Sequence, residues 1–420
     1  MDTSTSLRRP LRLAVVTETY PPEVNGVAAT IACCVQGLRD RGHQVQLVRP
    51  WQGHGDAVPA CDPLRGPPEV LLRGLPIPRY PHLRMGLPAG GVLRKLWRGT
   101  RPDLVHVVTE GPLGWSAVRA ARALGLPLSS DFRTNFHSYG AHYGLGWLRR
   151  PVAAYLRRLH NDTDLTMVPT EGLRRELAAQ GFDRLQVVAR GVDATLFDPR
   201  RRDAALRSQW GVEEDAPVVL HVGRLAPEKN LGLLWEAVQA MRQVEPRTRL
   251  VLVGDGPLRA QLERQWRGQG VVFAGQQSGT ALAAHYASGD LFLFPSETET
   301  FGNVTPEAMA SGLAVVAYDY AAAAGLLRTS TAGITNGMLA ALGEPAHFVQ
   351  SAVWLARMWR ERPAHVAAMR HAARATAAGL AWPAVVAQIE GHFAALLRAR
   401  GVTDAMPRPA LRAGTAAGGA

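Results

Sequence analysis

The chain has 420 residues, of which 47% are hydrophobic and 20% charged, a composition typical of packed globular proteins and not of disordered ones. At about 150 residues per domain, this length predicts two or three domains. The formal charge of +12 points to anionic partners, such as nucleic acid, anionic lipid or a phosphorylated substrate. Three cysteines, no signal-peptide pattern and no run near the roughly 18 apolar residues of a membrane span favour a cytoplasmic protein.

Short apolar runs alternate with helical patterns twice along the chain, which is typical of βα units and a parallel sheet. The first series predicts strands at 12–18, 44–50, 104–108, 127–132, 165–169 and 185–191, with helices near 27–41, 112–124, 149–160 and 171–180. The second predicts strands at 217–224, 249–256, 271–275, 291–296 and 314–319. The sequence therefore predicts an α/β protein of two doubly wound, Rossmann-like domains that face a cleft.

A polar stretch at 198–217 lacks strand character, so we expect an N-terminal domain at 10–198 and a C-terminal domain at 199–380. A C-terminal helix at 381–400 follows a Trp-Pro break, and a tail at 401–420, rich in Gly, Ala and Pro, is expected to be disordered. Ligands of open α/β sheets bind at the carboxyl ends of the strands. Candidate site residues are therefore sought in the loops that follow strands.

The loop after the first strand, TETYPPEVNGVA, places Gly26 at a helix start, where free amides favour a phosphate. An ordinary Asn-Gly turn is the alternative. In the second domain, HVGRLAPEKN ends a strand at Arg224 and places Lys229 at the mouth of a helix. Together these two cations could clamp a diphosphate, unless they are only solvated loop charges.

The stretch VGDGPLR resembles a dinucleotide fingerprint, but Arg259 stands where a third glycine is required. A glycine turn at Gly254, close to a nucleotide base or ribose, fits this stretch better than a nicotinamide cofactor site.

Two carboxylates flank the turn in ETETFGNVTPEAM. Glu299 lies in a loop, where it could accept hydrogen bonds from sugar hydroxyls, and the amides around Phe301 and Gly302 could bind the same ligand. Glu307 lies in the first turn of the next helix and could bind a ribose diol. The alternative is that Glu307 only complements the helix dipole while Thr305 or Asn303 caps the helix.

Taken in order, NGV, GRLAPEKN, GDGP and the Glu299 and Glu307 pair resemble the retaining GT-B glycosyltransferases of family 4, over residues 12–400 or so. TETYPPEVNGVA, EGPLGW and DFRTNFHSYGAHYG are most similar to GDP-mannose-dependent α-mannosyltransferases that act on lipids. The resemblance implies transfer of a hexose, mannose, from GDP-mannose to a membrane lipid or a lipid-linked glycan.

The resemblance also implies residue roles. Glu299 would hold the 3- and 4-hydroxyls of the donor sugar, Glu307 the ribose hydroxyls, and Arg224 with Lys229 the leaving diphosphate. Gly26 would face the β-phosphate from the other domain.

His137, in TNFHSYG, resembles the family's active-site histidine near the sugar's 6-hydroxyl and the reacting carbon. A lone histidine is otherwise more often a satisfied loop or core residue. One departure concerns residues 320–338, which carry no acidic residue where the family usually has an acid that anchors the donor. A UDP-sugar such as UDP-glucose is therefore the alternative donor.

The pair Asp162 and Asp164 invites a metal-dependent interpretation, but it precedes a buried strand and fits a helix-end turn better. We expect no metal and no cofactor besides the nucleotide-sugar cosubstrate, because the cationic clamp neutralises the diphosphate. No carboxylate is placed as a nucleophile, which favours front-face displacement, with catalysis chiefly by positioning and by charge stabilisation.

Other classes of function fit less well. A sugar-nucleotide epimerase would need acids and a histidine poised for elimination, and a pyridoxal-dependent phosphorylase would need a suitable lysine. A basic nucleic-acid-binding protein would need aromatic residues interleaved with the basic ones, and no such module is visible, so nucleic acid is not an expected partner.

Two acid-free stretches, 70–101 and 141–160, lie in the half expected to bind the acceptor. They mix basic residues with Trp97, Trp147, Leu148 and Tyr155, as helices at an anionic membrane interface do. The sequence thus predicts an enzyme peripherally associated with the inner face of the membrane. The alternative is that these apolar residues pack into the core of their own domain.

Overall fold

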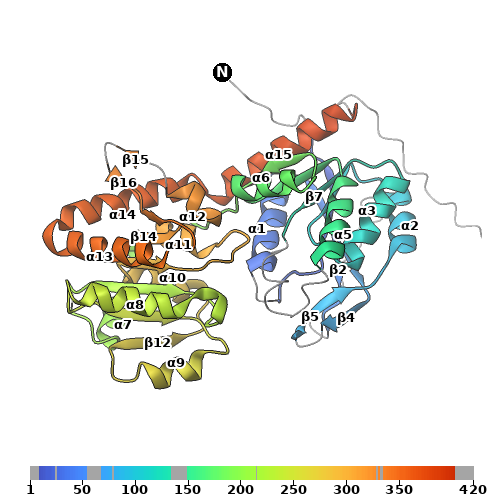
Figure 1. Cartoon of the computed structure of the whole chain (residues 1–420). Coiled ribbons are helices and arrows are strands. Elements are labelled where there is room, and N and C mark those ends of the chain that lie inside the picture. Colours follow the sequence, from blue (N-terminus) through green and yellow to red (C-terminus); the bar gives the residue numbers. More distant parts are fainter. Residues whose placement is uncertain are drawn as a thin grey trace, which may run out of the picture.

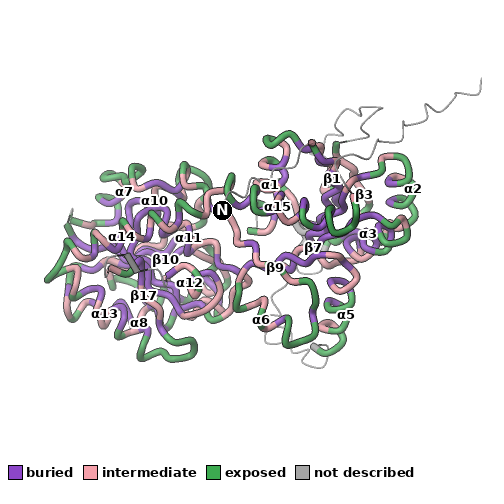
Figure 2. The backbone as a smooth tube through the Cα atoms, turned by 90° about the horizontal axis from the view of Figure 1, so that it is seen from above, coloured by how far each residue is buried: buried purple, intermediate pink, exposed green. Residues whose placement is uncertain are grey.

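The computed structural model describes residues 9–23, 26–53, 68–77, 80–133, 149–213, 215–327, 330–331 and 334–402. Two parallel sheets, of seven and six strands, form separate layers that are covered by helices (Figure 1). Buried residues follow the strands, and exposed residues lie on outer helices such as α2, α5 and α7 (Figure 2). The predicted fold class, two Rossmann-like α/β units, is confirmed.

The first sheet has the order β3-β2-β1-β6-β7-β8-β9, and its neighbouring strands are all parallel. Its strands β1, β6 and β8 are almost continuously buried because helices cover both faces. An antiparallel pair, β4 and β5, stands outside the sheet. The bounds are β1 Arg12–Val16, β2 Gln44–Pro50, β3 Glu69–Leu72, β4 Gly74–Ile77, β5 Tyr80–Gly86, β6 Leu104–Val107, β7 Leu128–Asp131, β8 Leu165–Val168, β9 Leu185–Val187, α1 Gly26–Asp40, α2 Gly90–Thr100, α3 Pro112–Ala123, α5 Arg149–Asn161 and α6 Glu171–Ala179.

The second sheet has the order β12-β11-β10-β13-β14-β17 and is also parallel throughout. Its central strands, of sequence VVLHV and LFLF, are buried at every position. The bounds are α7 Ala204–Gln209, β10 Val218–Val222, α8 Leu231–Arg242, β11 Arg249–Val253, α9 Arg259–Gln265, β12 Val271–Gly275, α10 Gly279–Ser288, β13 Leu291–Phe294, α11 Val304–Ala310, β14 Ala314–Tyr318, α12 Ala321–Leu326, β15 Ser330–Thr331, β16 Ile334–Thr335, β17 Met338–Ala340, α13 Pro345–Glu361 and α14 Pro363–Ala378.

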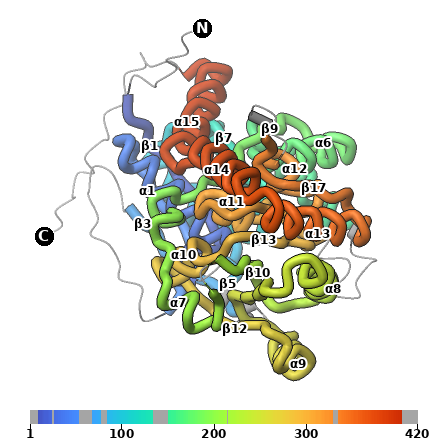
Figure 3. The backbone as a smooth tube through the Cα atoms, turned by 90° about the vertical axis from the view of Figure 1, so that its left-hand side faces the viewer, coloured from blue at the N-terminus to red at the C-terminus, as the bar shows by residue number. Residues whose placement is uncertain are grey.

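The last helix, α15 (Trp382–Ala399), returns to the first sheet and lies against α1 (Figures 1 and 3). Its residues Val385, Val386 and Phe393 join the hydrophobic core that β1 and α1 build. Where the chain crosses between the two sheets, a Cβ at Gly191 would lie 2.4 Å from the Trp382 indole, so this close approach requires glycine. The domain bounds 10–198 and 199–380 stay predictions, and residues 403–420 of the tail lie outside the described residues.

Two expectations for individual segments change. The stretch 198–217 contains a 3-10 turn, Pro199–Arg201, and helix α7, neither of which its polar composition predicted. Helix α2 buries Leu93 and Trp97 completely in the core beneath α3, so the expectation that Trp97 faces a membrane is wrong. The apolar face of α2 therefore packs against the core of its own domain. Trp147 and Leu148 lie outside the described residues, and no described helix is both long and apolar enough to cross a bilayer.

Candidate active site

A cavity of about 840 Å³ lies between the carboxyl edges of the two sheets. On one side it is lined by the start of α6 and by Ala189, and on the other by the loops that follow β13 and β14. Parallel sheets bind ligands at this edge, because the loops that follow the strands converge there. Of the predicted site residues, Glu299 and Phe301 line this cavity.

Lys229 and Glu299 form an ion pair across the edge of the second sheet. Lys229 ends a 3-10 turn, Pro227–Lys229, that follows β10, while Glu299 lies in the loop after β13. The Ser296 hydroxyl donates to the same Glu299 oxygen at 2.9 Å, and both charged side chains are 15% exposed. Lys229 is one of only two lysines in a chain with 47 basic residues, so a compact ammonium stands where arginine is otherwise the rule.

Glu307 lies in the first turn of α11 and accepts a 2.9 Å hydrogen bond from the Tyr286 hydroxyl. Burial raises the pKa of the Glu307 carboxyl to about 7, although the bond from Tyr286 acts in the opposite direction. Burial also raises the pKa of Tyr286 well above its usual value, so the phenol stays protonated and remains a donor. A carboxylate held in this way keeps acceptor capacity for a further hydroxyl pair.

The turn between Glu299 and α11 is shaped for close approach to a ligand. Gly302 has a φ of +86°, and the Phe301 side chain is buried at 3% exposure. The Tyr320 hydroxyl donates to the Glu299 carbonyl at 2.9 Å, and Ala322 N–H to the Phe301 carbonyl at 2.8 Å. Within the described residues, the amides of Phe301 and Gly302 donate to no acceptor, which leaves them available to an anion or a sugar.

Gly26 brings the first domain to the same place. It is the first residue of α1, and a Cβ built on it would lie 3.4 Å from the Asn303 side-chain amide. The start of α1 therefore faces the start of α11 across the cleft. Asn303 makes no side-chain cap on α11, so the capping alternative proposed from the sequence is not seen for this residue.

Arg224 and Gly254 lie in the loops that follow β10 and β11. The Arg224 side chain is 55% exposed, and its ion-pair partner among the described residues is Glu228, at 3.9 Å. Packing explains why position 254 is a glycine, because a Cβ there would lie 1.9 Å from the Gly223 carbonyl oxygen. Gly254 thus lets the loops after β10 and β11 meet.

The three other residues discussed from the sequence are His137, Asp162 and Asp164. His137 lies outside the described residues. Asp162 pairs with Arg122, and Asp164 accepts from the Leu128 amide at 2.9 Å, as expected of a helix-end turn.

Sequence reasoning missed the residues that support the site from other elements. Tyr286 comes from α10, Ser296 from the end of β13 and Tyr320 from the start of α12. Ser296 ends one predicted strand and Tyr320 follows another, which is a usable signal. Tyr286 lies inside a helix, and its hydrogen bond to Glu307 follows only from the three-dimensional contact between the two side chains.

Comparison with solved structures agrees with this architecture. Sucrose-phosphate synthase from Thermosynechococcus elongatus superposes with a TM-score of 0.71 at 18% identity, over 93% of this chain and 100% of that chain. The likeness shows the fold, which is that of the GT-B glycosyltransferases.

Residues 24–196 match the family model described as Glycosyltransferase Family 4, and residues 216–358 match Glycosyl transferases group 1. The GDP-mannose-dependent alpha-mannosyltransferase of Mycobacterium tuberculosis (strain CDC 1551 / Oshkosh) is 36% identical over 403 residues, which cover 94% of this chain and 99% of that protein. A GDP-mannose-dependent alpha-(1-6)-phosphatidylinositol dimannoside mannosyltransferase of the same strain is 38% identical over 157 residues, 36% of this chain and 40% of that protein. The chain belongs to glycosyltransferase family 4 and is a hexosyltransferase.

Proposed function

We propose that this enzyme transfers mannose from GDP-mannose to a membrane lipid or lipid-linked glycan, with retention of the anomeric configuration. The observation that carries the proposal is the Lys229 and Glu299 pair, placed beside free loop amides and the Tyr286-bound Glu307. The 36% identity to a GDP-mannose-dependent relative over nearly the whole chain supports the choice of sugar and nucleotide. UDP-glucose is the alternative donor, because residues 320–338 carry no acid.

In this proposal Lys229 exchanges Glu299 for the donor diphosphate, and Glu299 then accepts hydrogen bonds from the sugar's 3- and 4-hydroxyls. The Phe301 and Gly302 amides and Gly26 hold phosphate oxygens, and Glu307 holds the ribose hydroxyls. Arg224 is exposed and has room to turn toward the diphosphate as a second cation.

The leaving phosphate stays next to the sugar's anomeric carbon and takes the proton of the acceptor hydroxyl as the new bond forms. In this mechanism Glu299 accepts hydrogen bonds from the sugar hydroxyls and does not act as a nucleophile, so no covalent intermediate forms. Catalysis then comes from positioning and from stabilising the charge that develops on the leaving phosphate.

A second cavity, of about 470 Å³, supports an acceptor site in the first domain. It opens where Trp115 of α3 and Tyr155 of α5 lie in contact, with ring centroids 5.3 Å apart and ring planes tilted by 35°. The Tyr155 hydroxyl donates to the Glu110 carbonyl at 2.6 Å, which fixes the ring at the wall of the cavity. Aromatic walls with a few polar groups suit the apolar faces of a sugar or a glycerolipid.

Peripheral binding to an anionic membrane is proposed from the charges around this cavity. The exposed surfaces of α2 and α5 carry Arg94, Lys95, Arg98, Arg150, Arg157 and Arg158. Because Trp97 is buried, the contact is electrostatic and involves no insertion of α2 into the acyl chains.

A thermal-shift panel tests the donor. GDP should raise the melting temperature more than UDP or ADP, because a ligand at a hundred times its dissociation constant adds about 2.7 kcal/mol of stability. Transfer from GDP-mannose should also survive EDTA. A larger shift with UDP would move the proposal to UDP-sugars, and activity that is lost in EDTA and restored by magnesium or manganese would overturn the metal-independent mechanism.

A further inference from the structure

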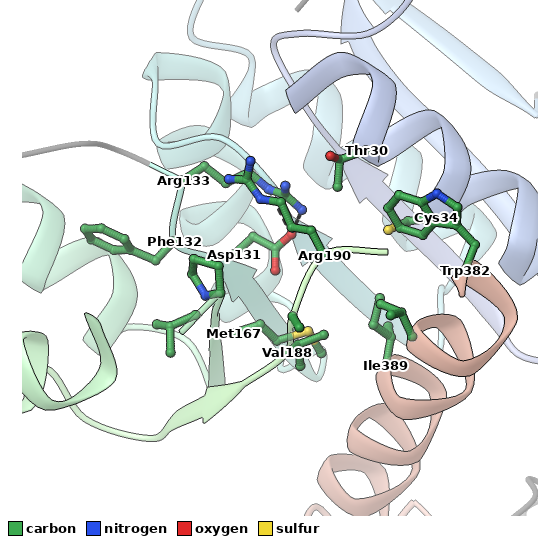
Figure 4. A pocket seen from close by; sticks show the side chains of 14 residues that line it. Thr30, Cys34, Asp131, Phe132, Arg133, Met167, Val188, Arg190, Trp382 and Ile389 are labelled. Carbon is green, nitrogen blue, oxygen red and sulfur yellow. Dashed lines mark hydrogen bonds and ion pairs between the residues drawn. The ribbon is translucent and has the colours of Figure 1, made fainter. Parts of the chain in front are cut away.

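Beneath the cleft, two arginines of the first domain share one small cavity (Figure 4). Arg133 follows β7, and Arg190 lies in the segment that leaves β9 for the second domain. Figure 4 shows the nitrogen ends of the two side chains together near the Asp131 carboxylate, with Thr30 of α1 beside them. Two like charges are therefore held close together in a confined space.

Asp131 serves one of these arginines. The Arg133 guanidinium forms an ion pair with Asp131, and its Nε donates to the same carboxylate at 3.1 Å. His106 Nε2 lies 3.5 Å from the same carboxylate oxygen, Oδ2. Burial opposes the effect, but Arg133 and His106 together hold the pKa of Asp131 well below its usual range. Asp131 is thus a permanent anion that is already paired.

Arg190 is left with a different neighbour. Its guanidinium lies over the Phe301 ring, with Cζ 5.7 Å from the ring centroid. Within the described part of the chain it forms no ion pair and no hydrogen bond, and the carboxylate of Glu299 is held by Lys229. Burial, together with the Arg133 cation, lowers the pKa of Arg190 to about 9, which leaves it charged at neutral pH.

Arg190 therefore brings a cation that has no ion-pair partner among the described residues to the turn that carries Glu299, Phe301 and Gly302, although Asp131 and Glu299 offset part of its charge from a distance. A partly buried cation without an ion-pair partner is costly, and an arriving anion removes that cost. The guanidinium fork also suits phosphate oxygens in bidentate geometry. The amides of Phe301 and Gly302 lie on the same turn, and Gly26 approaches it at Asn303.

We propose that Arg190 binds the terminal phosphate of the nucleoside diphosphate, opposite Lys229, so that the leaving group is held by a cation from each domain. Arg133 would stay paired with Asp131 and add positive charge beside Arg190 (Figure 4). This inference rests on the proposed function. It adds a residue of the acceptor-side domain to the donor site.

Calorimetric titration of the full chain with GDP and GMP tests the proposal. Arg190→Gln should weaken GDP about 10- to 100-fold, the effect of losing a charge-assisted contact, and should change GMP less than about threefold. Arg190→Lys should recover part of the loss, because it keeps the charge without the fork. Arg200→Gln is the matched control, since that side chain is 87% exposed and pairs only locally with Asp198.

Other outcomes separate the possible errors. Equal weakening of GDP and GMP would show that Arg190 only maintains the fold, and would overturn the inference. Unchanged GDP affinity with a raised KM for the acceptor would assign Arg190 to an acceptor phosphate and overturn it as well. If the wild-type protein binds UDP in place of GDP, the UDP and UMP pair is used, so that an error in the proposed donor does not count against Arg190. If the wild-type protein binds no nucleoside diphosphate, the proposed function fails, and the inference fails with it.

Discussion

At the residue scale, Lys229 and Glu299 are paired with each other, so each must give up this contact to bind the ligand proposed for it. Glu299→Ala should free Lys229, leave GDP affinity within about threefold of wild type or tighter, and reduce transfer by about 100-fold or more, because the sugar hydroxyls lose their acceptor. Lys229→Ala should weaken GDP about 10- to 100-fold. Calorimetry with parallel turnover assays measures both effects. An equal loss of GDP affinity in the two variants would contradict these roles.

The raised pKa of Glu307 makes donor binding depend on pH. Only the ionised carboxylate can accept from both ribose hydroxyls, so GDP affinity should fall about tenfold from pH 8 to pH 6 as the group protonates around pH 7. Tyr286→Phe removes the hydrogen bond that lowers this pKa and should move the midpoint to higher pH. Glu307→Gln should bind weakly at all pH values. A wild-type affinity that stays flat across this range would remove Glu307 from the ribose site.

The same shift has a consequence for stability. Because burial raises the folded-state pKa above the ordinary 4.5, the folded protein holds this proton more tightly than the unfolded chain. The stabilising effect is complete below about pH 4.5 and is lost as the pH rises through about 7. Any pH profile of GDP binding is therefore measured alongside the melting temperature, so that binding and folding are kept apart.

At the scale of elements, the positions of the central strands could be predicted because these strands are short, apolar and almost continuously buried, whereas β3, β4, β5 and β17 were not predicted. Predicted and observed strands differ chiefly at their carboxyl ends, as in 12–18 against Arg12–Val16, where the loop toward the cleft begins. The sequence of α2 predicts an interfacial helix, because periodicity shows that one face is apolar but not what covers that face. The contact of Trp97 with the core beneath α3 decides the matter, and it is visible only in three dimensions.

For the site residues too, sequence motifs identify some positions, and three-dimensional contacts identify the others. Glu299, Glu307 and Lys229 could be named from their motifs, but the ion pair joins residues 70 positions apart. Arg190 and Tyr286 carry no motif of their own. Their importance follows from what they contact across an element boundary, and a linear pattern does not contain that information.

The burial of Trp97 is itself testable. Trp97→Ala should cost about 3–5 kcal/mol of unfolding free energy, because a fully buried indole leaves a large cavity. Val92→Ala, on the exposed face of the same helix at 54% exposure, should change stability by less than about 0.5 kcal/mol. Urea denaturation measures both. Two equal, small effects would contradict the packing of α2 against the first sheet.

At the scale of the whole molecule, α2 and α5 carry exposed basic residues on the same domain as the proposed acceptor cavity, and the proposed function uses these charges to bind an anionic surface. Co-sedimentation with vesicles should require anionic lipid, weaken with salt and drop when Arg94, Lys95 and Arg98 are changed to Ser. Changing Arg264, Arg267 and Arg357 to Ser removes the same charge from exposed positions of the second domain and should have little effect. Equal recovery with neutral and anionic vesicles, or none with either, would favour a soluble acceptor.

The central claim is that one cleft joins a GDP-mannose site on the second sheet to a lipid acceptor site on the first. Its most direct test follows radiolabel from GDP-mannose into the organic phase, with mixed vesicles of phosphatidylinositol and diacylglycerol as acceptors. The account predicts labelled lipid with the wild-type enzyme, and its loss in Glu299→Ala while GDP affinity is retained. Label that enters lipid only from UDP-glucose, or that appears only in water-soluble product, would contradict it.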